Sequence, residues 1–166
     1  MQNRKHIAEF TDRVQAHQDI IHKVAFIYGR VPADREDLAQ EILLQLWRSY
    51  GSFNGRSAFS TWMYRVALNT AITFRRKQRP RVDEAPEPSV DAIQPLQAEL
   101  SDALKTLYRA IARLSAIEKA VIMQWLDERS YEEIADTVGI SVKNVSVRLV
   151  RIRKRLAQLI TEAEQT

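Results

Sequence analysis

The sequence contains no cysteine, which excludes disulfides and thiolate metal sites. It also has no apolar run long enough to cross a bilayer, and its N-terminus lacks the hydrophobic core of a signal peptide. Both absences fit a protein of a reducing cytoplasm, and that is the localisation we expect.

Glycine and proline are scarce as well, with four and five copies among 166 residues. Few glycines together with many Leu, Ala, Ile, Arg and Glu favour an all-α fold. Four of the five prolines lie between residues 80 and 95, among acidic side chains and few apolar ones. Proline blocks helix formation and this stretch has little to bury, so it is a predicted linker. It divides the chain into two small helical domains, residues 1–79 and 96–166.

The net charge of +4 is distributed unevenly. Lys and Arg outnumber Asp and Glu by 13 to 7 in residues 1–80 and by 11 to 9 in residues 101–166, whereas residues 81–100 carry one cation and five anions. The two basic blocks suit phosphate binding, and DNA would repel the acidic connector between them.

The most informative stretch runs from Ser130 to Leu156 and predicts a helix-turn-helix. Ser130 and Glu133 have capping-box spacing, Gly139 suits the left-handed conformation that ends a helix, and Ser141 can cap a second helix. The expected apolar face of the first helix consists of Tyr131, Ile134, Ala135 and Val138, and that of the second consists of Val142, Val145, Leu149, Ile152 and Leu156.

The opposite face of the second helix is basic. It carries Lys143, Asn144, Val147, Arg148, Arg151 and, further along, Lys154. A recognition helix in the major groove needs this arrangement, with its N-terminal side chains at base edges and its cations at phosphates. A plain helical hairpin would also have a solvated basic face, but the glycine, the two caps and the cationic row together favour DNA binding.

Further helices are expected from apolar periodicity. In the N-terminal domain they run from about His6 to Tyr28, from about Asp34 to Tyr50 with Leu38, Ile42, Leu43 and Leu46 facing inward, and from Thr61 to Gln78. In the C-terminal domain a helix near residues 96–114 uses Leu100, Leu104, Leu107 and Ile111, and a second starts with a capping box at Ser115 and Glu118 and ends near Asp127.

Two surfaces of the N-terminal domain are ambiguous on their residues alone. The helix face with Asp37, Gln40, Glu41 and Leu44 is either solvated or a protein-docking surface, since an exposed Leu among carboxylates resembles an interface core with a polar rim. The loop from Ser52 to Ser60 holds Phe53, Asn54, Gly55, Arg56, Ser57 and Phe59. Such a loop can accept an unstacked base, or its aromatic rings can simply anchor it to the core.

Enzymatic function has little support. The sequence has no Gly-rich phosphate loop and no cysteine nucleophile, and no carboxylate lies in register with His6, His17 or His22 to complete a metal site. We therefore expect no catalytic residue, no metal, no cofactor and no small-molecule substrate.

The order of these parts is similar to that of one protein family. The segments DREDLAQEILLQLWRSYGSF, SAFSTWMYRVALNTAITFRRKQR and LSAIEKAVIMQWLDERSYEEIADTVGISVKNVSVRLVRIRKRL resemble the extracytoplasmic-function (ECF) group of bacterial sigma-70-family RNA polymerase sigma factors. The D-L-x-Q-E-x-x-L-x-x-W pattern (Asp37 to Trp47) and the T-W-x-Y-R-x-A-x-N pattern (Thr61 to Asn69) are the most discriminating pieces. The resemblance extends over nearly the whole chain.

The resemblance implies a role for each surface. Asp37, Gln40, Glu41 and Leu44 would dock on the clamp helices of the largest polymerase subunit, and the flap of the second-largest subunit would be a further partner. The −10 promoter element would be bound by a loop and a basic helix that together supply Phe53, Asn54, Gly55, Arg56, Ser57, Phe59, Trp62, Arg65, Asn69, Arg75, Arg76 and Lys77. The −35 element would be read by Ser141, Lys143, Asn144, Val147, Arg148, Arg151 and Lys154.

The resemblance also implies that an anti-sigma factor is a partner and that it can hold the protein at the bacterial inner membrane. One departure concerns specificity, because relatives often carry a basic residue and then a Ser just before the Arg that matches Arg148. Ser146 and Val147 stand there in this chain, so base preference cannot be copied from relatives. The alternative function is a stand-alone dimeric helix-turn-helix regulator that binds palindromic duplex without polymerase.

Overall fold

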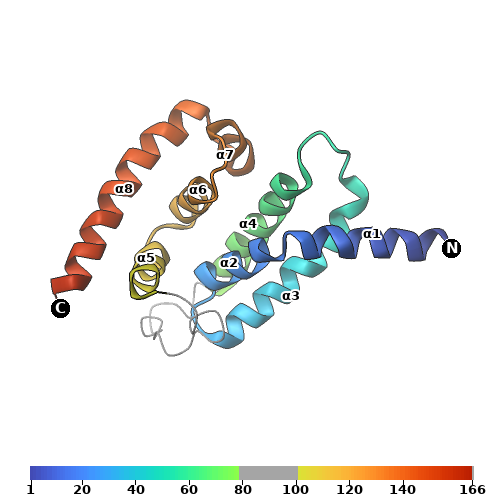
Figure 1. Ribbon diagram of the computed structural model, residues 1–166, viewed down its shortest axis with the longest axis horizontal. Helices are drawn as coiled ribbons and strands as arrows, with labels where there is room; N and C mark the ends of the chain where they lie inside the picture. The colour runs from blue at the N-terminus through green and yellow to red at the C-terminus, as the bar shows by residue number, and fades with distance from the viewer. Residues whose placement is uncertain (79–100, 166) are drawn as a thin grey trace. The chain divides into compact units, whose positions relative to one another are not determined.

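The computed structural model describes residues 1–78 and 101–165, and these fold as helices joined by short turns (Figure 1). The chain divides into two compact units, Met1–Pro88 and Ser89–Thr166. The predicted all-α fold is confirmed. The predicted linker, residues 80–95, lies outside the described residues.

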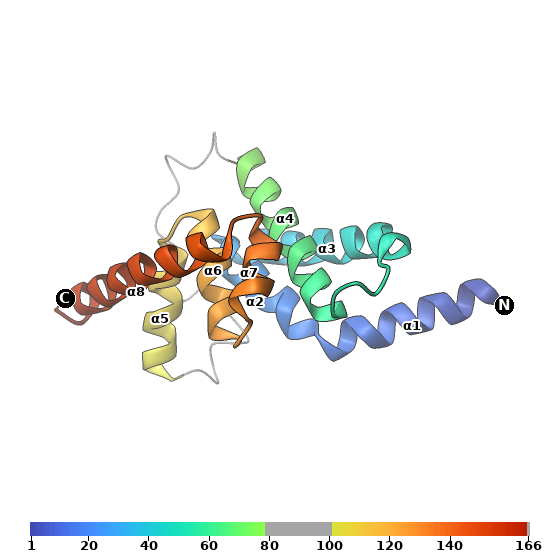
Figure 2. The same cartoon turned by 90° about the horizontal axis from the view of Figure 1, so that it is seen from above.

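The N-terminal unit is built on three helices that pack against one another: α2 (Gln18–Tyr28), α3 (Pro32–Ser49) and α4 (Phe59–Gln78). Their shared core is fully enclosed and includes Val24, Leu38, Ile42, Leu46, Met63 and Ala67. A short 3₁₀ turn, η1 (Tyr50–Ser52), follows α3. The first helix, α1 (Gln2–Ala16), extends away from the N-terminal end of α2 (Figures 1 and 2).

One expected helix is in fact two. The helix predicted from about His6 to Tyr28 is broken at His17, whose backbone leaves the helical region at φ −126° and ψ 24°. Apolar spacing continues across the break, because Phe10 and Val14 before it and Ile21 after it are all buried. The apolar periodicity of the sequence therefore does not reveal the break at His17.

The turn between α2 and α3 depends on Gly29 and Arg35. The Arg35 Nε donates to the carbonyl oxygens of Phe26 (3.2 Å) and Gly29 (3.1 Å), which ties the end of α2 to the start of α3. A Cβ at Gly29 would lie 2.6 Å from Arg35 Cγ, so only glycine leaves room for this contact. The helix α3 begins at Pro32, two residues earlier than predicted, since proline suits the first position of a helix.

The C-terminal unit consists of α5 (Asp102–Ala112), α6 (Ala116–Leu126), α7 (Tyr131–Val138) and α8 (Val142–Gln165). The predicted capping box at α6 is confirmed, because Ser115 Oγ accepts the Glu118 N–H (3.3 Å) and the Glu118 carboxylate accepts the Ser115 N–H (2.9 Å). The first described residue of the long helix expected near residues 96–114 is Ser101, which caps α5.

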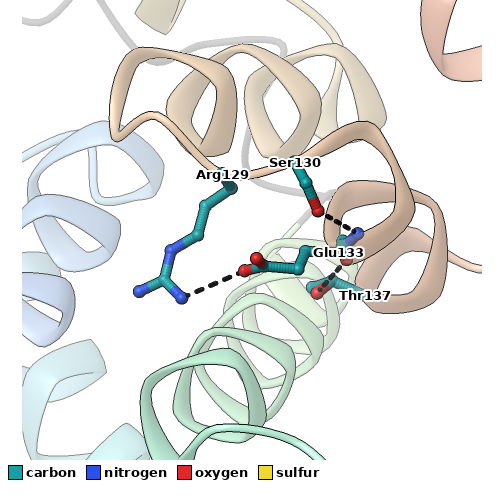
Figure 3. Close-up of polar contacts among 4 residues, drawn as sticks. All are labelled: Arg129, Ser130, Glu133 and Thr137. Carbon is teal, nitrogen blue, oxygen red and sulfur yellow. Dashed lines mark hydrogen bonds and ion pairs between the residues drawn. The ribbon is translucent and has the colours of Figure 1, made fainter.

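The helix-turn-helix forms as predicted at its two turns. Ser130 Oγ accepts the Glu133 N–H (3.1 Å) and Ser141 Oγ accepts the Asn144 N–H (3.1 Å). Gly139 ends α7 with φ +79°, in the left-handed region that favours glycine. One detail differs, because the Glu133 carboxylate accepts from Arg129 (3.3 Å) rather than returning to the Ser130 N–H (Figure 3).

The predicted inward faces are mostly correct. Val145, Leu149, Ile152 and Leu156 are buried along α8, as expected. Four residues predicted to lie on inward apolar faces are exposed: Val142 (42%), Leu43 (44%), Leu104 (40%) and Tyr131 (39%). Tyr131 is the first residue of α7. Val142 is the first residue of α8 and Leu104 lies in the first turn of α5, where few neighbours cover them, and Leu43 lies to one side of the buried row of α3.

The cap at Ser130 yields a test of the fold. We expect Ser130→Ala to lower the free energy of unfolding of the C-terminal unit by about 1 kcal/mol, because the Glu133 N–H loses its acceptor. Urea unfolding of the full chain, followed by circular dichroism at the helix band, measures the change.

The matched control is Ser146→Ala, which changes an exposed residue in the interior of α8, where alanine is the better helix former. Equal stability losses for the two variants would contradict a capping role for Ser130.

Candidate nucleic-acid and protein interfaces

A groove between α3 and α4 brings together residues that the sequence places in two different sites. Asp37, Gln40 and Leu44 on α3 are exposed, and Glu41 is half-buried with its carboxylate accepting from Gln45 Nε2 (3.1 Å). The groove has a volume of about 720 Å³ and is lined by Asp37, Gln40, Glu41, Leu44, Gln45, Asn69, Thr70, Thr73, Phe74 and Lys77.

This groove combines both predicted functions of the N-terminal unit. Asn69 and Lys77, predicted to bind DNA, line it together with the residues predicted to bind polymerase. Thr73 and Phe74 were not singled out from the sequence. Their spacing from Asn69 on the same helix was the available signal, but only the packing of α3 on α4 shows that they face Leu44.

The cations at the end of α4 differ in exposure. Arg76 and Lys77 are exposed, whereas Arg75 is half-buried. Burial lowers the pKa of Arg75, and nearby Arg30 lowers it further while Asp34 opposes the change. Arg75 is thus less accessible than Arg76 and Lys77. Arg65 is half-buried on α4.

The loop after η1 rests on an aromatic cluster. The rings of Phe53 and Phe59 meet edge to face at 5.5 Å, and Trp62 contacts each of them at 5.3 Å. Tyr50 joins the cluster through Phe59 (6.3 Å) and Trp62 (6.4 Å). The rings thus anchor the loop, which is the simpler of the two expectations for them.

The tip of the loop is exposed and holds its shape through local bonds. The Asn54 side-chain oxygen accepts the Arg56 N–H (3.0 Å), an arrangement typical of an Asx turn. Gly55 has φ +75°, which favours glycine at this position. Asn54, Gly55 and Arg56 are exposed and Ser57 is half-buried, so the polar groups of the tip are accessible to a ligand.

The recognition face of α8 is accessible along its length. Ser141, Lys143, Asn144, Val147, Arg151 and Lys154 are exposed, and Arg148 is half-buried. Val150 is 56% exposed, and it was not singled out from the sequence. It lies seven residues after Lys143 and therefore close to the same face, which was the signal that could have identified it.

Glu118 of α6 lies beside this face. A shallow hollow of about 220 Å³ is lined by Glu118, Asn144, Val147, Arg148, Arg151 and Ile152. Because the Glu118 carboxylate also caps α6, its position is fixed next to the recognition cations. This acidic neighbour could be found only from the packing of α6 on α8.

Within residues 1–78 and 101–165, no cluster of His, Asp and Glu could hold a metal ion. In the same residues, no helix is both long and apolar enough to cross a membrane.

Both units match models of known protein families. Residues 13–81 match the family model described as Sigma-70 region 2, and residues 104–156 match Sigma-70, region 4. The chain is 35% identical over 154 residues to the ECF RNA polymerase sigma-E factor of Escherichia coli, covering 81% of this chain and 79% of that protein. It is 31% identical over 163 residues to the RNA polymerase sigma-H factor of Pseudomonas aeruginosa, covering 86% and 84%.

Comparison with solved structures also finds a sigma factor. The sigma factor RpoE in complex with the anti-sigma factor NepR from Bartonella quintana matches with a TM-score of 0.75 and 26% identity, over 92% of this chain and 97% of that one. CnrH in complex with the cytosolic domain of CnrY has the same fold, with a TM-score of 0.65 and 22% identity over 92% and 88% of the two chains.

Proposed function

This chain belongs to the ECF group of sigma-70-family RNA polymerase sigma factors, and from that premise we propose how its surfaces divide the work of transcription initiation. As a sigma factor it binds core RNA polymerase and promoter DNA, and it is an initiation factor rather than an enzyme. We assign polymerase docking and the −10 element to residues 1–79, the −35 element to residues 96–166, and the connection between them to residues 80–95.

The observation that carries this assignment is the groove between α3 and α4. Leu44 is 40% exposed and has Asp37, Gln40 and Glu41 around it, so the surface has an apolar centre with a polar rim. We propose that this surface docks on the clamp helices of the largest polymerase subunit, and that the C-terminal unit contacts the flap of the second-largest subunit.

We assign the −10 element to the loop tip and the exposed side of α4. Asn54, Gly55, Arg56 and Ser57 would capture an unstacked base, and the anchored Phe53, Phe59 and Trp62 would hold the tip in place. Arg65, Asn69, Arg76 and Lys77 would follow the single strand, with Arg75 contributing charge from the buried side. DNA melting then uses only the binding energy for exposed bases.

We assign the −35 element to the first half of α8. Lys143, Asn144 and Arg151 offer donors to base edges and phosphates, with Ser141, Arg148 and Lys154 as further polar contacts. Val147 and Val150 are exposed apolar groups suited to thymine methyls. The hydroxyl of Ser141 also caps α8, so it both positions the helix and lies at its DNA-facing end.

Regulation by an anti-sigma factor is a further part of the proposal. Its support is the likeness to RpoE in complex with NepR, at 26% identity over 92% of this chain. We propose that this cytoplasmic protein is kept from polymerase by such a partner, including one that holds it at the inner membrane. A stand-alone dimeric regulator is not favoured, because both units match sigma regions in their family order.

The docking assignment predicts that Asp37→Arg abolishes co-purification with bacterial core RNA polymerase while the chain stays folded. The change places a cation in an interface whose charges are complementary, and like charges across an interface cost several kcal/mol. Transcription from a pool of promoter fragments, with start sites mapped for the wild type, gives the second readout.

The control for this variant is Glu36→Arg, which makes the same change of charge at the exposed preceding residue, outside the groove. Normal holoenzyme formation by Asp37→Arg would contradict the docking site.

The −35 assignment predicts one of two results for Arg151→Ala. Loss of a base contact weakens binding to the upstream element by about 1–3 kcal/mol. Loss of a phosphate contact instead lowers the salt slope, the slope of log affinity against log salt concentration, by about one unit. Binding is measured at several salt concentrations with holoenzyme and selected promoter fragments.

Arg109→Ala on α5 removes the same charge from an exposed position in the same unit and serves as the control. No change in affinity or slope would remove Arg151 from the interface.

A further inference from the structure

The aromatic anchor of the loop has a cation over it that comes from α1. The guanidinium carbon of Arg13 lies 5.8 Å from the ring centre of Phe53 and 5.7 Å from that of Phe59. Both distances are within the range of a cation–π contact. Arg13 is held in turn by Glu9, whose carboxylate accepts from Arg13 Nη2 (3.0 Å). A side chain forty or more residues away in the sequence thus contacts both aromatic residues at the ends of the loop.

The position of the exposed tip depends on these two rings. Phe53 precedes the tip and Phe59 begins α4, so the contact between the rings closes the loop at its base. The tip itself is held by the bond between the Asn54 side chain and the Arg56 N–H. A group that fixes the separation of Phe53 and Phe59 therefore also fixes where the polar groups of the tip are presented.

We propose that Arg13 is a positioning residue for base capture at the −10 element. It bridges Phe53 and Phe59 and holds the tip, residues 54–57, in the shape that discriminates the captured base, while Glu9 keeps the guanidinium over the rings. The inference rests on the proposed function of the loop. It adds a residue of α1, outside the loop and α4, to the determinants of specificity.

The geometry favours positioning over direct phosphate binding. The Arg13 side chain is 41% exposed, and its guanidinium contacts Glu9 and the two rings. The guanidinium is already engaged by the Glu9 carboxylate and by both rings, which are the contacts that a positioning role requires. A planar guanidinium can face two rings, whereas the compact ammonium of lysine would contact them less completely.

The test compares Arg13→Gln with the wild type in two measurements. Hydrogen exchange by NMR on the free full-length chain follows the N–H groups of Phe53, Arg56 and Trp62, which bond to Tyr50 O, Asn54 Oδ1 and Ala58 O. We expect their exchange to accelerate by about two- to fivefold, the range that one cation–π contact supports.

The second measurement is base discrimination by the holoenzyme. The probe is a single-stranded oligonucleotide with the −10 sequence of a promoter that the wild-type holoenzyme transcribes, together with versions changed at one base each. For Arg13→Gln the ratio of affinities for matched and changed oligonucleotides should fall by about two- to fivefold. Arg13→Lys should recover part of the ratio, and Glu9→Gln should lower it without removing a cation.

Arg4→Gln is the matched control, since it removes the same charge from an exposed position on the same helix. If Arg13→Gln weakens all oligonucleotides equally and lowers the salt slope by about one unit, Arg13 is a phosphate contact and the proposal is wrong. Unchanged discrimination would also overturn it. If Arg13→Gln fails to fold, Arg13→Lys and Glu9→Gln decide by the same ratio. Absence of discrimination by the wild type itself would overturn the assignment of the loop as well.

Discussion

The orientation of the recognition helix depends on the backbone at one turn. The Ala135 carbonyl oxygen accepts both the Gly139 N–H (2.9 Å) and the Ile140 N–H (3.2 Å), and Gly139 turns the chain with a positive φ. An isolated helix as short as α7 would be marginal in water, so its caps and its packing on α6 and α8 maintain it. The direction in which α8 leaves this turn therefore sets which of its side chains are available for the proposed −35 contact.

In the N-terminal unit, packing brings together residues of α3 and α4 that were assigned to different functions from the sequence. The residues assigned to polymerase and some of those assigned to the −10 strand line one groove between α3 and α4. Ring contacts connect α1, η1, the loop and the start of α4, through Phe10, Tyr50, Phe53 and Phe59. The surfaces proposed for docking and for base capture therefore lie at opposite ends of the same two helices, which pack together through the buried Leu38, Ile42 and Leu46.

Features decided by local chemistry could be predicted from the sequence, as Ser115, Ser130, Gly139 and Ser141 show. The all-α fold and the buried rows of α3 and α8 followed from composition and periodicity. The break at His17 could not be predicted, because the apolar spacing is continuous there. The contacts of Arg13, the position of Glu118 beside the recognition face and the partial burial of Arg75 could not be predicted, since each depends on which helix packs beside these residues. Site assignments by residue came from family resemblance and stay predictions.

Few residues of the recognition face of α8 also bury or cap the helix. Val145, Leu149, Ile152 and Leu156 bury the helix, while Lys143, Val147, Val150 and Arg151 project outward, and Ser141 alone belongs to both sets. Substitutions on the outer face carry little folding cost. After gene duplication, a copy of this chain can therefore diverge in promoter preference while selection on its core stays unchanged.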